Sequence, residues 1–115
     1  MALHPDARDN FSQTGTAINA GATSLNVAQT GAAAVQYAIT HLSGSTDVSG
    51  NLLLYDGAVA AANVRYQVKI PANSPFQSLF DEPVVLTAGN AATARIDSGS
   101  IAVSLNLVGY RISNA

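Results

Sequence analysis

The sequence predicts an all-β protein with two stacked antiparallel sheets. Short apolar segments recur along the chain with turn-forming residues between them, and about eight or nine are long enough to be strands of a β-sandwich. The segment 63–71, NVRYQVKIP, alternates apolar with polar residues, which is typical of a strand with one face in water. The alanine-rich segment 57–63 is shorter than the ~12 residues that an independent helix needs, so we expect a loop or a single turn there.

Turn signals place the expected strands in order along the chain. Residues that favour chain reversal, mainly Gly, Asn, Ser, Thr and Pro, are concentrated between the apolar segments. The expected strands are 16–20, 24–28, 34–42, 52–57, 63–71, 76–80, 84–86, 92–98 and 101–113. In the last strand the apolar phase changes between Leu107 and Val108, beside Gly109, which predicts a β-bulge at this point.

Residues 1–15 differ in character from the rest of the chain. They are polar and irregular, and Leu3 and Phe11 are large apolar side chains among them. We therefore expect an extended N-terminal arm over residues 1–15 and a single sandwich domain over residues 16–115. A terminus of this kind either frays or docks on a neighbouring molecule.

The strand at 52–57 is apolar on both faces. Leu52 and Leu54 point to one side, and Leu53 and Tyr55 point to the other. One pair can fill the core of the sandwich, and the second pair must be covered by a loop of the same chain or by another copy of the chain. Only 10% of the residues are charged, against about 25% in ordinary soluble domains, and this neutral surface favours the second copy. We therefore predict that Leu53 and Tyr55 lie at a subunit interface.

The sequence offers no constellation typical of an enzyme or of a metal site. The chain has no Cys, and its two histidines, His4 and His41, have no carboxylates at ligand spacing. We expect His41 to face inward near a strand end as a hydrogen-bonded structural residue. Asp56-Gly57 reads as a turn. We therefore predict no catalytic residue, no cofactor and no metal.

The charge pattern and the hydropathy indicate whether the chain binds nucleic acid or a membrane. Net charge is −2 and the five basic residues are scattered, whereas nucleic-acid binding requires clustered cations. No apolar run approaches the ~20 residues of a membrane helix, and the first residues do not read as a secretory signal. We therefore predict neither nucleic acid nor membrane as a partner, and synthesis in a cytoplasm.

The order of segments in the second half of the chain resembles that of small jelly-roll proteins of tailed-phage virions. The resemblance covers residues 52–112 and lies in LLLYDG, the alternating NVRYQVKI, SPFQSLFDEPVVLTAGNAATARI and the closing SIAVSLNLVGY. It implies an eight-stranded antiparallel jelly roll, often a homotrimer, that acts as a capsid decoration or cement protein. Such a protein would be made in the host cytoplasm and would bind the major capsid protein on the outer head surface.

For the N-terminal arm the resemblance implies contacts with the capsid or with neighbouring subunits. The residues expected to make these contacts are Leu3, His4, Arg8 and Phe11. A carbohydrate-binding jelly-roll module, such as a receptor-binding tip or a head-fibre component, is the alternative function. The chain has no Trp, and Tyr37, Tyr66 and Tyr110 are expected on inward phases, which leaves few aromatic platforms for sugar stacking. A small assembly factor absent from the virion is a third interpretation.

Overall fold

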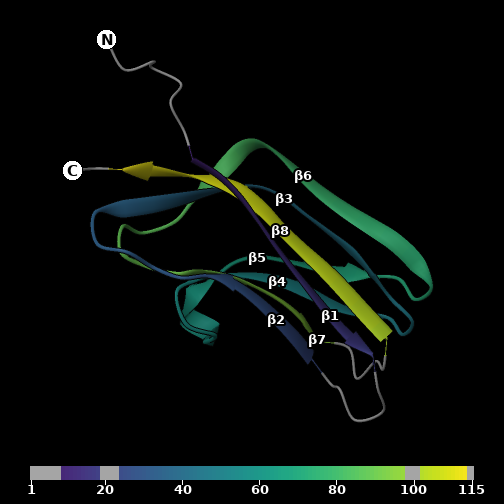
Figure 1. Ribbon diagram of the computed structural model, residues 1–115. Coiled ribbons are helices and arrows are strands. Elements are labelled where there is room, and N and C mark those ends of the chain that lie inside the picture. Colours follow the sequence, from purple (N-terminus) through teal and green to yellow (C-terminus); the bar gives the residue numbers. More distant parts are fainter. Residues whose placement is uncertain (1–8, 19–23, 98–101, 114–115) are drawn as a thin grey trace.

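The computed structural model describes residues 9–18, 24–97 and 102–113, which form eight strands and one short 3-10 turn, η1. The elements are β1 (Asp9–Ile18), β2 (Ser24–Gln29), β3 (Val35–Thr46), β4 (Gly50–Asp56), η1 (Ala61–Asn63), β5 (Val64–Ile70), β6 (Ser74–Val85), β7 (Ala92–Asp97) and β8 (Ala102–Ser113). The strands build two four-stranded antiparallel sheets that stack face to face (Figure 1). The prediction of an all-β sandwich is confirmed.

The strand order identifies the sandwich as a jelly roll. Sheet A has the order β1-β8-β3-β6, and sheet B has the order β2-β7-β4-β5. Strand β1 pairs with β8, β2 with β7, β3 with β6, and β4 with β5, so the first four described strands pair antiparallel with the last four. This is the pairing of one long hairpin rolled over itself, which is how a jelly roll is built.

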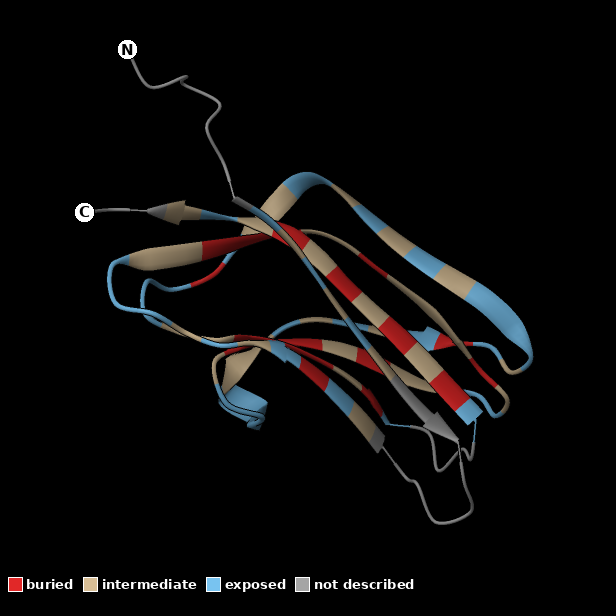
Figure 2. Ribbon diagram, viewed as in Figure 1, coloured by how far each residue is buried: buried red, intermediate tan, exposed pale blue. Residues whose placement is uncertain are grey.

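The core lies between the two sheets and is filled from alternate positions of each strand. Figure 2 shows this alternation on β8, where buried residues at the odd positions 103–109 alternate with half-buried ones. The largest fully buried side chains come from both sheets and, in the case of Leu86, from the loop that follows β6: Tyr37, Ile39, Leu42, Leu52, Leu54, Leu86, Ile96, Leu105 and Leu107. At one side of the sandwich the sheets are also joined by a hydrogen bond, from Gln13 to the Gln29 side-chain oxygen at 2.7 Å.

The first strand begins earlier than the sequence indicated. Phe11 pairs with Gly109 and Gly15 with Leu105, so residues 9–15 belong to sheet A and not to an N-terminal arm. Gly15 faces the core, where a Cβ atom would lie 2.7 Å from a methyl group of Val27. The polar residues on alternate positions form the wet face of an edge strand. The predicted arm boundary at residue 15 is therefore corrected, and residues 1–8 lie outside the described residues.

The bulge predicted at Leu107–Val108 lies opposite this point on the neighbouring strand β3, where Ile39 pairs with Gly109 and His41 with Val108. Strand β8 keeps one register against β1 throughout, and the register shift lies in β3, between Ile39 and His41. The apolar phase changes at Val108 because this residue lies on the outer face of sheet A, while the inward phase continues through Gly109. The same shift turns His41 outward, beside Val108, and not inward as expected.

A second register shift shapes β6. Val84 pairs with Ile39 and Leu79 with His41, so residues 80–83 bulge out of the pairing with β3. The two segments expected as separate strands, 76–80 and 84–86, are joined through this bulge, and β6 runs without a break from Ser74 to Val85.

A buried carboxylate holds the end of β4 in place. Asp56 is 3% exposed and accepts hydrogen bonds from the backbone N–H of Thr87 at 3.1 Å, from the Thr87 hydroxyl at 2.6 Å and from the Asn90 amide at 3.0 Å. The Arg65 guanidinium lies 3.3 Å away. Burial raises the pKa of Asp56, but the Thr87 and Asn90 hydrogen bonds and the Arg65 charge outweigh it, so its pKa lies below the usual 3.8. Gly57, at φ +99°, makes the expected turn.

Substituting Gly109→Ala tests the close approach of β8 to β3. A Cβ atom at this position would collide with the carbonyl oxygen of Ala38, so the paired strands must separate. Overpacking of this kind costs about 1–3 kcal/mol, and we expect the melting temperature to fall by roughly 4 °C or more. Thermal unfolding followed by circular dichroism measures the change, with the exposed Ser12→Ala as the matched control. An unchanged melting temperature for Gly109→Ala would contradict the β3–β8 register.

Substituting Asp56→Asn tests the carboxylate cluster. Loss of the charge weakens several charge-assisted hydrogen bonds, and we expect a destabilisation of about 1.5–3 kcal/mol at pH 7. Because the folded-state pKa of Asp56 is lowered, its contribution is complete above about pH 4 and is lost as pH falls through that pKa. The stabilities of the wild type and the variant should therefore converge in acid. Urea unfolding across pH gives the comparison, with the exposed Asp97→Asn as control.

Candidate assembly surfaces

The outward apolar side chains of β4 are partly buried by other residues of the same chain. The β4–β5 register shifts so that Leu54 pairs with Tyr66 and Tyr55 with Val64, which leaves Arg65 as the extra residue and turns Val64 to the outer face. Val64, together with the loop that contains η1, lies beside Tyr55, which is only 6% exposed in a single chain. The prediction that Tyr55 needs a second subunit to cover it is therefore corrected in favour of the loop.

Leu53 is the apolar outward residue of β4 that its own chain leaves half-buried. It pairs with Gln67 on β5 and with Arg95 on β7, in the middle of the outer face of sheet B. A hollow of about 560 Å³ opens over it, which we call the sheet B hollow. Its lining residues are Leu53, Tyr55, Val59, Ala60, Ala61, Val64, Gln67, Arg95 and Asp97. The hollow therefore has an apolar floor on the side of η1 and a charged margin.

Basic side chains lie on the outer face of sheet B, and one of them, Arg95, lines the sheet B hollow. Arg65, Lys69 and Arg95 occupy the outer face of β5 and β7, and they are three of the five basic residues of the chain. As predicted, residues 65, 67 and 69 form the exposed face of β5. Asp97 is an exposed carboxylate at the same margin. Because Asp56 is buried beneath Arg65, the outer face of sheet B presents more positive than negative charge.

A contrasting surface lies on β6, the edge strand of sheet A. Leu79 is 66% exposed and Val85 is 52% exposed, and these are the two most exposed large apolar side chains among the described residues. Asp81 and Glu82 lie between them on the bulge and are exposed as well. Figure 2 shows that no residue along β6 is buried. We call Leu79, Asp81, Glu82 and Val85 the β6 ridge.

The rest of the outer face of sheet A has a polar and an apolar half. In the polar half, the Thr14 hydroxyl donates to the Asn106 side-chain oxygen at 2.6 Å, and the Asn106 amide donates to the Ser43 hydroxyl at 3.4 Å. In the apolar half, Tyr110 and Val85 flank Ala38, which is fully buried although it faces outward. The apolar half is continuous with the β6 ridge.

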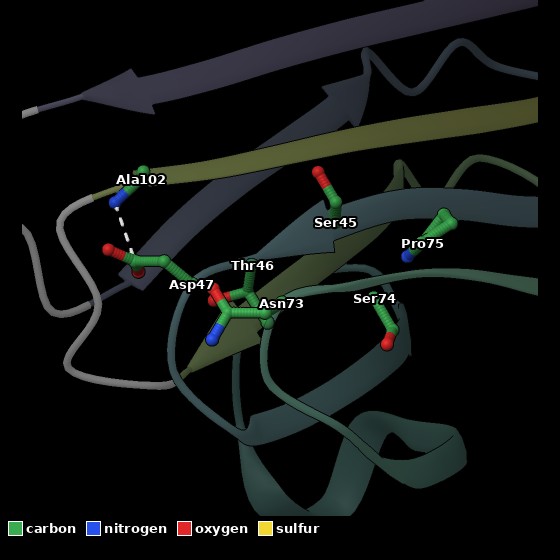
Figure 3. Close-up of a pocket in the computed structure, with 7 residues that line it drawn as sticks. All are labelled: Ser45, Thr46, Asp47, Asn73, Ser74, Pro75 and Ala102. Atoms are coloured by element: carbon green, nitrogen blue, oxygen red, sulfur yellow. Dashed lines mark hydrogen bonds between the residues drawn. The ribbon is translucent and has the colours of Figure 1, made fainter.

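A second hollow, of about 280 Å³, lies at the loop end of the sandwich and is polar. Figure 3 shows Asp47 as the only carboxylate among its labelled residues, with an Oδ1 atom that accepts a hydrogen bond from the Ala102 backbone N–H at 3.3 Å. Asn73, at φ +58°, supplies the tight turn, and its N–H donates to the Thr46 carbonyl at 2.8 Å. Among the described residues no group of three His, Cys, Asp or Glu side chains converges. This hollow therefore offers neither a nucleophile–base pair nor a metal cage.

Of the predicted contact residues in the arm, Phe11 is placed by the structure. Its ring packs edge-on against Tyr37, with centroids 5.3 Å apart, so it contributes to the chain's own core and is not held out for a neighbour. Leu3, His4 and Arg8 lie outside the described residues. The β6 ridge was missed, although the out-of-phase Leu79 and the charged 81–83 segment were the available signal.

The aromatic side chains do not form a sugar-stacking platform in the part of the chain that the structure describes. Tyr37 and Tyr66 face inward as expected, and the Tyr66 and Phe80 rings meet edge-on at 4.9 Å. Tyr110 lies on the outer face of sheet A, which corrects its expected inward phase, and it is half-buried there. Every described Phe and Tyr is at least half-buried. Within the described ranges, no helix is long and apolar enough to cross a membrane.

Comparisons with known proteins support the fold. No family model and no curated protein sequence matches the chain. Among solved structures, the Tobacco streak virus coat protein is similar, with a TM-score of 0.56 and 11% identity, covering 98% of this chain and 90% of that one. A structure of Bacillus endospore appendages, described as disulfide-linked pili, aligns over 100% of this chain and 97% of that one at 10% identity, with a TM-score of 0.34. The chain shares the β-fold of a virus coat protein.

Proposed function

We propose that this protein is a structural component of a virus particle. The observation that carries the proposal is the likeness to a virus coat protein, which spans nearly the whole of both chains and agrees with the jelly-roll strand order. The described hollows contain no reactive constellation, so the surface features that remain to be explained are apolar and charged contact areas. Contact areas without chemistry suit a protein whose task is assembly.

Within that class we propose a decoration or cement protein that binds the outer surface of a tailed-phage head as a homotrimer, after synthesis in the host cytoplasm. Its partner is the major capsid protein. The sequence resemblance over residues 52–112 and the low content of charged residues support this narrower assignment. Three modest contacts from one trimer reinforce each other through effective concentration, so weak individual sites give durable attachment.

The segment before β1 is our candidate for capsid attachment. Because residues 9–15 are part of sheet A, the attachment role falls to residues 1–8, which contain Leu3, His4 and Arg8. An apolar anchor flanked by a cation and a histidine can combine burial of Leu3 with charge-assisted hydrogen bonds to a capsid surface.

The proposed role predicts that the chain is present in purified virus particles. Purified mature virions of the virus that encodes this chain should contain it in a fixed copy ratio to the major capsid protein, measured by quantitative mass spectrometry. Particles lacking the chain should release their genome at a lower temperature, because a ligand that binds only the intact shell stabilises it by about 2.7 kcal/mol per site at 100 times its Kd. Absence from purified particles would leave an assembly factor as the better assignment.

Deletion of residues 2–8 tests the proposed attachment segment. A chain lacking them should keep its fold, since β1 remains complete, and should bind empty capsids at least roughly tenfold more weakly per contact if a buried Leu3 is lost. Leu3→Ser in the full chain is the matched point variant, and Ala2→Ser is its control. Sedimentation of capsids with bound protein measures the affinity. Unchanged binding of both variants would remove the segment from the attachment site.

A further inference from the structure

We infer that copies of this chain associate head to tail, with the β6 ridge of one copy seated in the sheet B hollow of the next. This inference rests on the homotrimer of the proposed function and names its interface. A closed ring of three copies cannot use one self-complementary patch, because each subunit must present two different surfaces that fit each other. The β6 ridge and the sheet B hollow are two such surfaces, and they lie on different sheets.

Both surfaces are partly apolar, and one carries a bulge where the other is hollowed. The ridge is the outer margin of an edge strand, and its bulge at residues 80–83 stands out of the pairing with β3. The hollow is a depression with Leu53 in its floor and Val59 and Val64 on the η1 side. Seating Leu79 over Leu53 would bury the exposed side chain of Leu79 and the half-buried side chain of Leu53. A single chain leaves both of them in contact with water.

The β6 ridge is acidic, and the outer face of sheet B around the hollow carries more basic than acidic side chains. Asp81 and Glu82 are adjacent exposed carboxylates on the ridge, and in the described part of the chain neither forms an ion pair. Arg95 lines the hollow beside Asp97 and donates a hydrogen bond to the Asn26 side-chain oxygen at 3.5 Å. The exposed Lys69 lies on the same face of sheet B, two positions from Gln67 of the lining. Opposite charges across an interface guide the partners into one register, and like charges across it are costly.

A twofold contact fits these surfaces less well. Two ridges facing each other would bring Asp81 and Glu82 of both copies together, and two hollows facing each other would leave the apolar side chains of both ridges in water. The first arrangement sets like charges against each other where apolar surface is being buried. Ridge against hollow is the pairing that satisfies both the apolar and the charged groups.

The ridge docks through side chains and not by adding a strand to a sheet. An edge strand that accepted another strand would need a row of unobstructed backbone groups, and β6 has Pro75 and Pro83 as well as the charged bulge. These features are the usual protection of an edge against open-ended strand pairing. They leave the ridge side chains available while preventing fibrous growth through the backbone.

Complementary single-surface variants test the inference. Leu79→Asp disables the ridge and keeps the hollow, whereas Leu53→Asp disables the hollow and keeps the ridge. We expect the wild type to have three times the 11.7 kDa mass of one chain, and each variant alone to be a monomer, with an apparent Kd raised about 10- to 100-fold. An equimolar mixture should give a species of twice the chain mass and no larger, because one intact ridge meets one intact hollow and both remaining surfaces are disabled.

A charge exchange at more exposed positions covers the risk that Leu53→Asp disturbs folding. The ridge variant carries Asp81→Lys and Glu82→Lys, and the hollow variant carries Lys69→Glu and Arg95→Glu. Each should dissociate the trimer, and a single chain with all four substitutions should restore it. Ser12→Asp, on β1 at the opposite edge of sheet A, is the control and should remain a trimer. Light scattering coupled to gel filtration gives the masses, and circular dichroism confirms folding.

Several outcomes overturn the inference and are separable from the virion assignment. A trimer that survives both Leu79→Asp and the ridge charge reversal uses another surface. A variant that stays a dimer by itself reveals a twofold contact. Failure of the complementary mixture to associate, with a trimeric wild type, excludes the ridge–hollow pairing. A monomeric wild type at micromolar concentration removes the homotrimer as well, while presence of the chain in purified particles is decided independently by mass spectrometry.

Discussion

The antiparallel pairing of β8 with both β1 and β3 is the interaction on which the rest of the structure depends. It joins the last strand of the chain to the first, and it seats three successive inward residues, Val103, Leu105 and Leu107, against the core of sheet B. The approach is close enough that Gly44 and Gly109 have no space for a side chain, because the backbone of the neighbouring strand occupies it. The position of β6, and with it the ridge, follows from its pairing with β3.

The sequence allowed the fold class to be predicted because alternation survives in the strands that border water. Residues 65, 67 and 69 identified β5 without knowledge of its neighbours, since a wet face requires polar residues at every second position. The bulge could not be placed in the same way. Both faces of β8 carry apolar residues. The alternation in the sequence therefore does not indicate which face of this strand points into the core. The register shift that turned His41 outward lies between Ile39 and His41 in β3, and no Gly or Pro marks this point in the sequence.

The same ambiguity limited the prediction of contact residues. Leu53 and Tyr55 share a phase, and the sequence treats them as equivalent, yet the β5 bulge at Arg65 brings Val64 over Tyr55 alone. Phe11 stood out as an apolar residue in a polar segment because its strand partners lie about 100 positions away, a separation at which local pattern carries no information. The β6 ridge was overlooked because DEP resembles a turn, and in the fold it is a bulge within one strand.

A chain with few charges makes each of them more informative about assembly. Here three of the five cations lie on the outer face of one sheet, and two adjacent carboxylates lie on the edge strand of the other. On a highly charged surface such a separation would be obscured by neighbouring charges of both signs, and the cost of a wrong contact would be small. Neutral Ser, Thr and Asn side chains cover much of the outer face of sheet A, so in the proposed ridge–hollow contact misaligned arrangements would gain little and the charged side chains would set the register. Low charge and a specific interface are therefore compatible properties of the same surface.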